Sequence, residues 1–162
     1  MKVELATEAD IPAIMAIERS PGFDSLVGCW SAEEHAAEMA KPSARYFIMR
    51  EDGEPAGFVM IQRLGEGHDK AHLRRIAVAI PGKGAGTRLI NGVLDWLYTE
   101  TDVNRIDLDV YIENERARRS YEKAGFQVEG RLRDYHRNED GTYRDMWLMS
   151  ILRRDWAKRH RL

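Results

Sequence analysis

The sequence predicts an α+β fold, in which a single mixed, mostly antiparallel sheet carries helices on both faces. Strand-like and helix-like segments follow one another in the order β-α-α-β-β-β-α-β-α-β-β rather than in regular alternation. Two Asp-Gly pairs, at 52–53 and 140–141, each separate two strand-like runs, which is typical of tight hairpins. A chain of 162 residues is long enough for one domain with a sizeable core, so we expect a single domain over 1–162.

The first half of the chain is expected to form a strand, two short helices and three further strands. In order, these cover residues 3–6, 11–18, 31–40, 44–52, 56–64 and 70–80. Each helix follows a pair that can form a capping box, Thr7 with Asp10 and Ser31 with Glu34. The stretch SPGFDSLVG at 20–28 separates the helices, and its Pro, Gly and Ser content is typical of a loop.

The second half is expected to alternate helices and strands before a final hairpin, over residues 87–100, 105–112, 114–126, 127–136 and 143–152. The segment TRLINGVLDWLYTE places its apolar residues on one helical face. RIDLDVYI alternates apolar and acidic residues, which indicates a strand with one buried face. Gly125 stands where a left-handed helix cap is expected. The last ten residues, RRDWAKRHRL, are mostly basic, and we expect them to be a solvated end.

Composition narrows the classes of partner. The formal charge of −2 gives no indication of a nucleic-acid or anionic-membrane partner. Cys29 is the single cysteine, which excludes an internal disulfide and a cysteine-based metal site. The N-terminus MKVELATEADIP has no apolar signal region, and no stretch approaches the ~18 apolar residues of a membrane span. We therefore expect a cytoplasmic protein that binds no metal, nucleic acid or membrane.

A glycine-rich turn lies between a strand and a helix in IAVAIPGKGAGTRLI, residues 76–90. Glycines at alternate positions let the backbone approach an anion, and the first N–H groups of the helix add the positive end of its dipole. The sequence therefore predicts a pyrophosphate site built from main-chain N–H groups. Since Pro81 has no N–H, we assign the donors to Gly82, Lys83, Gly84, Ala85, Gly86 and Thr87.

Two common nucleotide motifs do not fit this turn. A Walker A loop requires Gly-Lys-Ser/Thr, but here Lys83 precedes a glycine and no Ser or Thr follows it. A dinucleotide fold requires Gly-x-Gly-x-x-Gly with an acid about 20 residues later. Asp107 and Asp109 lie at that distance, but the glycines are one residue too close together and the turn comes after several strands. A strand–helix turn without a ligand is the remaining alternative, and three alternating glycines disfavour it.

The segments LRRIAVAIPGKGAGTRLI and NERARRSYEKAGF together resemble the GNAT superfamily of acetyl-CoA-dependent N-acetyltransferases. The chain looks most similar to the bacterial branch that contains the ribosomal-protein N-terminal acetyltransferases, over roughly residues 3–152. The resemblance implies acetyl-CoA as co-substrate and direct acetyl transfer to a primary amine in a ternary complex. It also implies that the strand at Ala77 and Val78 binds the thioester arm, with a bulge that splays two strands and frees an amide. Pro81 stands where the family usually has Arg or Gln, which we expect to weaken coenzyme binding rather than abolish it.

Asn114, Ala117 and Tyr121 share one helical face because they are spaced at i, i+3 and i+7. The resemblance implies that Asn114 contacts the pantetheine arm and that Tyr121 protonates the departing thiolate. A phenol with a pKa near 10 can donate a proton to a thiolate. The alternative for Tyr121 is an ordinary core aromatic.

The acceptor amine must lose a proton before it can attack. His72, on the strand before the glycine turn, lies where some family members carry a glutamate base, and an imidazole suits that task. Glu113, at the end of the next strand, is the second candidate. Each has a structural alternative, a satisfied strand histidine for His72 and a helix-entry carboxylate for Glu113.

The resemblance places the acceptor pocket near Phe23 and Trp30, with Tyr135 of the last hairpin facing them. The pocket loops carry no motif that identifies the acceptor, so a protein α-amine, a polyamine, an amino acid and an amine-bearing antibiotic all stay open. The oligomeric state is also open, with a homodimer as one option. The rival function from another class is a non-catalytic acyl-CoA sensor or interaction module.

Overall fold

In the residues that the computed structural model describes, 1–20 and 28–162, the chain forms a seven-stranded sheet in the order β1-β2-β3-β4-β5-β7-β6. The strands are β1 (Lys2–Leu5), β2 (Arg45–Glu51), β3 (Glu54–Gln62), β4 (Lys70–Val78), β5 (Arg105–Tyr111), β6 (Gln127–Arg137) and β7 (Tyr143–Leu152). Neighbouring strands pair antiparallel except β4 with β5, which are parallel. The predicted mixed, mostly antiparallel sheet is confirmed.

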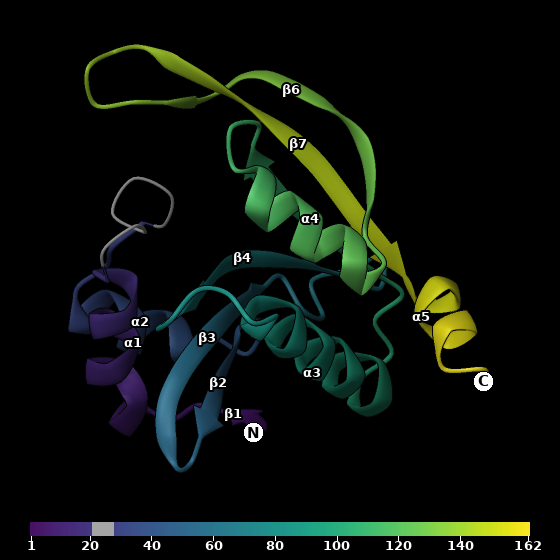
Figure 1. Ribbon diagram of the computed structural model, residues 1–162, viewed down its shortest axis with the longest axis horizontal. Helices are drawn as coiled ribbons and strands as arrows, with labels where there is room; N and C mark the ends of the chain where they lie inside the picture. The colour runs from purple at the N-terminus through teal and green to yellow at the C-terminus, as the bar shows by residue number, and fades with distance from the viewer. Residues whose placement is uncertain (21–27) are drawn as a thin grey trace.

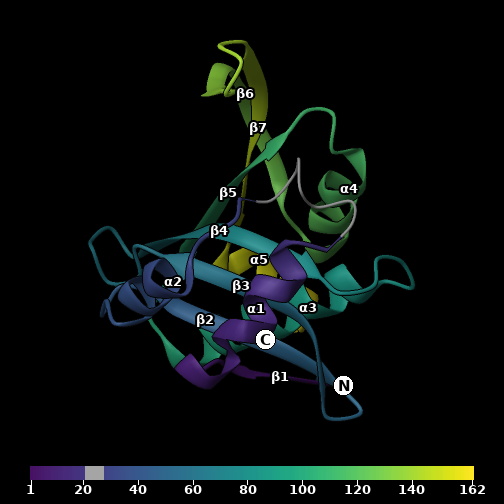
Figure 2. The same cartoon turned by 90° about the vertical axis from the view of Figure 1, so that its left-hand side faces the viewer.

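Helices cover both faces of this sheet, as predicted. They are a 3₁₀ turn η1 (Glu8–Asp10) and the α-helices α1 (Ile11–Glu18), α2 (Ala32–Met39), α3 (Ala85–Glu100), α4 (Glu115–Ala124) and α5 (Arg153–Arg159). Figures 1 and 2 show α1 and α2 on one side of strands β1–β4 and α3 on the other. The hairpin of β6 and β7 extends away from this body, beyond α4 (Figure 1). In the part of the chain that the structure describes, no helix is both long and apolar enough to cross a membrane.

The two capping boxes form as the sequence predicts. The Thr7 N–H donates to the Asp10 carboxylate at 2.9 Å. The Ser31 N–H donates to Glu34 at 2.8 Å, and the Glu34 N–H donates back to the Ser31 hydroxyl at 3.2 Å. These reciprocal bonds satisfy N–H groups that a helix start leaves without partners. The Ser31–Glu34 box sets where α2 begins, and the Thr7–Asp10 box sets where η1, the turn that leads into α1, begins.

Residues with positive φ also match the predicted turns. Asp52 and Gly53 have φ of 50° and 83°, the left-handed pair that a two-residue hairpin requires. Gly125 ends α4 at φ 109°. The sequence predicts both the Asp52–Gly53 turn and the end of α4, because each depends on only a few consecutive residues.

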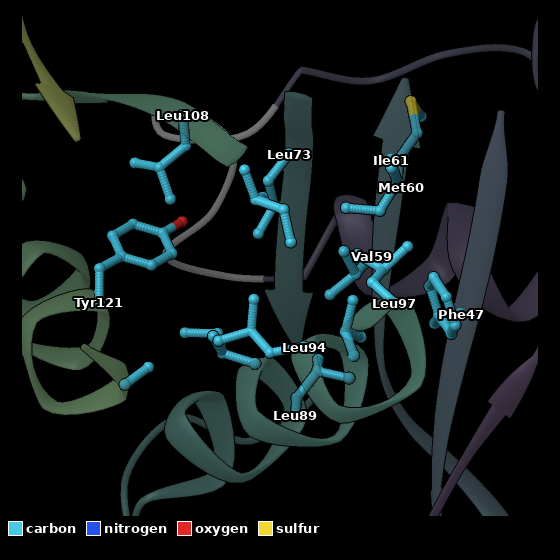
Figure 3. Close-up of a cluster of buried hydrophobic side chains, with 14 of the residues drawn as sticks. Phe47, Val59, Met60, Ile61, Leu73, Leu89, Leu94, Leu97, Leu108 and Tyr121 are labelled. Atoms are coloured by element: carbon cyan, nitrogen blue, oxygen red, sulfur yellow. The ribbon is translucent and has the colours of Figure 1, made fainter. Parts of the chain in front are cut away.

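The apolar face of α3 is central to the core. Its buried members, Leu89, Ile90, Val93, Leu94 and Leu97, all have at most 2% of their surface exposed. Figure 3 shows Leu89, Leu94 and Leu97 beside Val59 of β3 and Leu73 of β4. Because burying such side chains contributes about 1.5–3 kcal/mol each, this packing fixes α3, and with it the glycine turn that opens the helix.

Strands β4 and β5 pair over a short stretch, from Lys70 with Arg105 to His72 with Asp107. Immediately afterwards β4 is bulged against β3, because Met60 pairs with Arg75 while the next residue, Ile61, pairs with Leu73. Arg74 is therefore the extra residue. A bulge bends its strand and leaves a residue outside the ladder, so β4 turns away from β5 at this point.

The expectation of a solvated C-terminal end is wrong for residues 153–159, which form α5. Trp156 is 9% exposed, its ring centroid lies 5.4 Å from that of Tyr98, and its indole N–H donates to Asp95 at 2.8 Å. One buried tryptophan holds a helix that is otherwise basic. The basic composition did not indicate this helix, because the burial of Trp156 depends on its contact with Tyr98, 58 positions earlier.

Candidate functional site

A cavity of about 450 Å³ opens where β4 and β5 diverge. Its walls come from the bulged part of β4, the glycine turn, the end of β5 and one side of α4. The lining residues include Leu73, Arg74, Arg75, Ala77, Val78, Pro81, Gly82, Gly84, Ala85, Gly86, Thr87, Asp109, Tyr111, Asn114, Arg116, Ala117, Arg119 and Tyr121. The structure therefore brings together every residue predicted to bind the coenzyme except Lys83.

The glycine turn leaves open space along its backbone. Gly82 and Gly84 have φ of 102° and 71°, which L-residues rarely adopt, and Gly84 is the N-cap of α3. A Cβ added to Gly82 would meet no described atom within 4 Å, and one added to Gly86 would reach only the Ser120 hydroxyl at 3.9 Å. The Ala85 N–H donates to the Gly82 carbonyl at 3.1 Å, so it closes the turn. The following N–H groups, in the first turn of a 16-residue helix, point along the positive end of its dipole.

Arg88 braces this turn from outside the cavity. Its guanidinium donates to the Lys83 carbonyl and, at 2.9 Å, to the Glu51 carboxylate at the end of β2. Lys83 has φ of 53°, so a non-glycine residue is held in the left-handed region beside Gly84.

Tyr121 projects from α4 toward the fork of the sheet. Figure 3 shows its ring beside Leu108 of β5, with the hydroxyl directed toward Leu73 of β4. The residue is only 6% exposed, and burial, with a smaller contribution from the charge of Asp109, raises the pKa of Tyr121 above that of a free phenol. The phenol is therefore protonated throughout the physiological pH range.

Asn114 is the N-cap of α4, where its side-chain oxygen accepts a hydrogen bond from the Ala117 N–H at 3.2 Å. This bond orients the side chain on the cavity wall and leaves its amide NH₂ as the group available to a ligand. A capping role and a binding role are thus compatible in Asn114.

The two candidate bases, His72 and Glu113, were expected at the site where the amine loses its proton. Neither His72 nor Glu113 is among the described residues that line the cavity. The Glu113 side chain is 63% exposed and lies 3.6 Å from Arg144. His72 donates through Nδ1 to Asp107 at 2.7 Å, and its Nε2 lies 3.8 Å from Asp109.

Asp109 is the acidic residue that sequence reasoning missed as a site residue. It lies on the cavity wall between β4 and α4, and its side chain is 21% exposed. The alternation in RIDLDVYI indicates that Asp107 and Asp109 share one face of β5. The parallel neighbour that brings His72 against them comes from 35 positions earlier, which no local pattern shows.

The predicted acceptor residues are only partly brought together. Phe23 lies outside the described residues. The Trp30 ring lies under the guanidinium of Arg75, with 4.9 Å from the Arg75 Cζ to the ring centroid, and Arg75 lines the cavity. Tyr135 is 57% exposed on the β6 hairpin and is not among the residues that line the cavity. Its neighbour His136 packs against Tyr111, with ring centroids 5.4 Å apart, and Met146 of β7 is the hairpin residue that lines the cavity.

A buried carboxylate fixes the wall near Trp30. Glu18, at the end of α1, is fully buried and accepts hydrogen bonds from Arg75 at 2.6 Å, His35 at 3.0 Å and the Trp30 N–H at 3.4 Å. Burial alone would raise the pKa of Glu18, but the hydrogen bonds and charges of His35 and Arg75 outweigh it and hold the pKa below its ordinary value. We call Glu18, Trp30, His35 and Arg75 the Glu18 cluster. It joins α1, α2 and Trp30, two positions before α2, to β4.

The sequence matches one protein family. The family model of the acetyltransferase (GNAT) family matches residues 11–126, and the chain belongs to this family. The resemblance seen in the sequence is thereby confirmed.

Individual relatives differ in the amine that their names specify. The spermidine N(1)-acetyltransferase of Escherichia coli K12 is 33% identical over 121 residues, which cover 74% of this chain and 64% of the relative, less than two thirds of its length. The aminoglycoside N(6')-acetyltransferase type 1 of Klebsiella pneumoniae is 28% identical over 153 aligned positions, covering 79% of this chain and 74% of the relative. A Bacillus subtilis protein provisionally named as a ribosomal-protein alanine N-acetyltransferase is 28% identical over 142 residues, covering 86% and 89%.

Solved structures confirm the fold over nearly the whole chain. The crystal structure of the Vibrio cholerae spermidine N-acetyltransferase in complex with CoA and spermine superposes with a TM-score of 0.83, covers 96% of each chain and is 24% identical. A point mutant of the same enzyme gives a TM-score of 0.84 over 99% of each chain. At this identity the likeness establishes the arrangement of strands and helices, and not the substrate.

Proposed function

We propose that this protein is an acetyl-CoA-dependent N-acetyltransferase that moves an acetyl group to a primary amine of a protein N-terminus or a small molecule. The observation that carries the proposal is the cavity at the fork, because it connects the glycine turn to a buried, protonated tyrosine. Family membership and the three named relatives support the reaction type, since each relative is named for transfer to an amine nitrogen. A ternary complex with direct attack is the mechanism that these features favour.

The residues present fit the coenzyme. The diphosphate would lie against the N–H groups that open α3, where the missing side chains of Gly82, Gly84 and Gly86 leave space. Arg116 and Arg119 line the same cavity and add positive charge on the α4 side. The arm of the coenzyme would run along Ala77 and Val78 toward Asn114. When bound, acetyl-CoA supplies the acetyl group as a thioester.

Tyr121 is the proposed general acid. Acyl transfer expels a thiolate, and a positioned phenol can protonate that sulfur as negative charge develops on it. The raised pKa keeps the Tyr121 proton in place until then. The bulge at Arg74 supports the proposed thioester contact, since it takes a backbone amide of β4 out of the ladder with β3, beside the cavity.

The test is a thiol-release assay with acetyl-CoA and three acceptors chosen from the relatives: spermidine, a peptide with an N-terminal alanine, and an aminoglycoside. Calorimetry with acetyl-CoA runs in parallel. We expect coenzyme binding together with amine-dependent thiol release. Binding without release across these and a broader amine panel would instead support the non-catalytic sensor, for which the exposure of Glu113 and the absence of His72 from the described cavity wall are the favouring observations.

Three further expectations from the sequence stay predictions. They are a single domain over 1–162, a cytoplasmic location and, as one option, a homodimer. Light scattering of the purified chain measures the oligomeric state directly.

A further inference from the structure

The charged residues on the described wall of the cavity are mostly basic. Asp109 is the one acidic residue among them. The basic residues are Arg74 and Arg75 on β4 and Arg116, Arg119 and Lys123 on α4. The cavity in which an amine is proposed to react is thus poor in negative charge.

The basic residues of α4 lie on the coenzyme side of the cavity. A Cβ added to Gly86 of the glycine turn would come within 3.9 Å of the Ser120 hydroxyl, so this part of α4 lies beside the turn. Arg119 precedes Ser120 directly, and Lys123 follows one helical turn later. Phosphate groups of the coenzyme are the anions that these cations would meet.

Arg75 is enclosed, and its charge is balanced by a neighbour. Its guanidinium donates to the buried Glu18 carboxylate at 2.6 Å, and its Cζ lies 4.9 Å from the centroid of the Trp30 ring. A Cβ added to Gly28 would lie only 2.5 Å from Arg75 Nη2, so the backbone there packs directly on the guanidinium. With 5% of its side chain exposed, Arg75 holds the wall together and offers a ligand little free charge.

Arg74, the next residue of the strand, differs in each of these respects. It is the extra residue of the β4 bulge, and its side chain is exposed and lines the cavity. Within residues 1–20 and 28–162, no carboxylate or other acceptor pairs with that side chain. A bulge takes a side chain out of the regular alternation of a strand, which accounts for two successive arginines with different surroundings. Arg74 is therefore a cation on the cavity wall that the described part of the fold leaves unused.

The position of Arg74 along β4 separates it from the phosphate end of the cavity. An extended strand advances about 3.3 Å per residue, so Arg74 lies about 13 Å before Val78 and farther still from the glycine turn. It lies two positions after His72, where the pairing of β4 with β5 ends. Figure 3 shows the Tyr121 hydroxyl directed toward Leu73, the residue before Arg74. A group bound at Arg74 would therefore belong to the acceptor and not to the phosphates of the coenzyme.

We propose that the acceptor is a primary amine that also carries a carboxylate, and that Arg74 binds this carboxylate and so selects the acceptor. The inference rests on the proposed acetyltransferase function and names its substrate class. A guanidinium can bind a carboxylate through two parallel hydrogen bonds, which gives orientation as well as attraction. The same cation disfavours a polyamine, which would bring several ammonium groups to a wall with one described acidic residue.

The carboxylate can come from two sources with the same chemistry. In a free amino acid it is the α-carboxylate, and in a peptide it is an acidic side chain next to the N-terminal residue. The experiment therefore measures thiol release for pairs of acceptors that differ in one charge. Alanine with alaninamide tests the first source, and two C-terminally amidated peptides that begin Ala-Glu and Ala-Gln test the second. Spermidine is the polycation for comparison.

We expect kcat/KM for the carboxylate member of one pair to exceed that of its neutral partner by about 10–100-fold, because a hydrogen-bonded ion pair contributes more than a neutral hydrogen bond. The pair that shows the difference identifies the source of the carboxylate. Spermidine should be a poorer acceptor than the favoured member.

Variants at Arg74 assign the preference to one side chain. Arg74→Gln should raise the KM of the carboxylate acceptor until both members of the pair agree within about threefold, and Arg74→Glu should reverse their order. Acetyl-CoA affinity of Arg74→Gln, measured by calorimetry, should stay within about twofold of the unaltered protein, which also shows that the variant folds. Arg154→Gln is the matched control, because Arg154 is an exposed arginine of α5 outside the described cavity wall, and it should keep both rate and preference.

The outcomes are distinct. A protein that releases thiol but favours no carboxylate acceptor over its neutral partner, or favours spermidine over both, would overturn this inference and leave the proposed function intact. An unchanged preference in Arg74→Gln would also overturn it, and weaker acetyl-CoA binding in that variant would assign Arg74 to the coenzyme instead. No thiol release by the unaltered protein with any amine would overturn the proposed function and this inference together.

Discussion

Replacing Glu18 with Gln should lower the stability of the folded protein and leave its affinity for acetyl-CoA unchanged. The substitution keeps the shape and one oxygen of the side chain but removes the negative charge from the centre of the Glu18 cluster. Arg75, which has 5% of its side chain exposed, would then be a buried cation without its carboxylate. The change lies on the side of the fork where we expect the acceptor amine, and away from the glycine turn.

The expected loss of stability follows from burial. Removing one partner of a buried ion pair costs about 3–5 kcal/mol, because the other charge stays desolvated. The Gln oxygen can still accept one hydrogen bond, so we expect the lower end, about 3 kcal/mol. For a chain of this size 1 kcal/mol shifts Tm by roughly 2–4 °C, which gives a fall of about 6–12 °C.

The loss should also depend on pH. The folded-state pKa of Glu18 is held below its ordinary value of 4.5, so the contribution of its charge is fully present above that pH. It disappears as the pH falls through the lower folded-state value, because the carboxylate then becomes neutral in both states. The Tm difference between the original protein and Glu18→Gln should therefore be constant near neutral pH and should narrow on acidification below about pH 4.5.

The assay is calorimetric or fluorescence-detected unfolding, followed by kinetics with the best amine. Glu18 anchors Arg75 at the wall of the cavity and Trp30 against Arg75, so the KM for the amine should rise by about three- to tenfold. Acetyl-CoA affinity should not change, because the turn at Gly82–Gly86 makes none of these contacts. Glu4→Gln is the matched control, since its pairs with Arg50 and Lys2 lie at the surface, where solvent and salt weaken an ion pair.

Two results would refute the reasoning. Equal Tm losses in Glu18→Gln and Glu4→Gln would show that burial does not set the strength of the pair. A fall in acetyl-CoA affinity that matches the rise in amine KM would show that the Glu18 cluster does not act on the acceptor side alone. The double variant Glu18→Leu with Arg75→Met adds a further check, because removing both charges should recover much of the stability without recovering the KM.

Three further predictions concern other parts of the molecule. Tyr121→Phe should lower kcat by about 10²–10⁴-fold with acetyl-CoA affinity unchanged by calorimetry, and an unaltered turnover would exclude the acid role. Gly84→Ala should weaken acetyl-CoA binding several-fold in the same titration, because φ of 71° costs an L-residue about 1–2 kcal/mol and the turn would relax away from it. Trp156→Ala should destabilise the protein by about 3–5 kcal/mol in denaturant unfolding, whereas a near-neutral result would mean that α5 contributes little to the core.

Most of the fold could be predicted from short-range patterns. The capping pairs, the Asp52–Gly53 turn and the apolar face of α3 each involve residues within a few positions of one another, and the structure confirms them. The second Asp-Gly pair also lies in a hairpin, but in a five-residue connection in which only Gly141 has positive φ. Helix α5 was missed because its stability depends on Trp156 reaching Tyr98 and Asp95, which belong to α3. A long-range contact of this kind leaves no periodic signal in the sequence.

The candidate site divides in the same way. The glycine turn and the face of α4 with Asn114 and Tyr121 were found because turn residues and helical spacing are local. Asp109 and the Glu18 cluster were not predicted as site residues. Asp109 lies near His72 because β4 pairs in parallel with β5, and the Glu18 cluster forms because α1 and α2 pack against β4. His72 was predicted as a candidate base, but the sequence did not show that it contacts Asp107 or that it lies outside the described lining of the cavity.

By itself, then, the sequence determined the order and approximate position of every element before α5, which backbone can approach an anion and which helix presents a phenol. Each of these follows from steric freedom, hydrogen-bond capping or a 3.6-residue period within one segment. Only the tertiary structure decided that β4 leaves β5 after a single short pairing, and so which carboxylate faces the cavity and which imidazole lies behind it. The reason is physical: the contact of His72 with Asp107 spans 35 positions and that of Glu18 with Arg75 spans 57, so the fold, and no local pattern, brings these groups together.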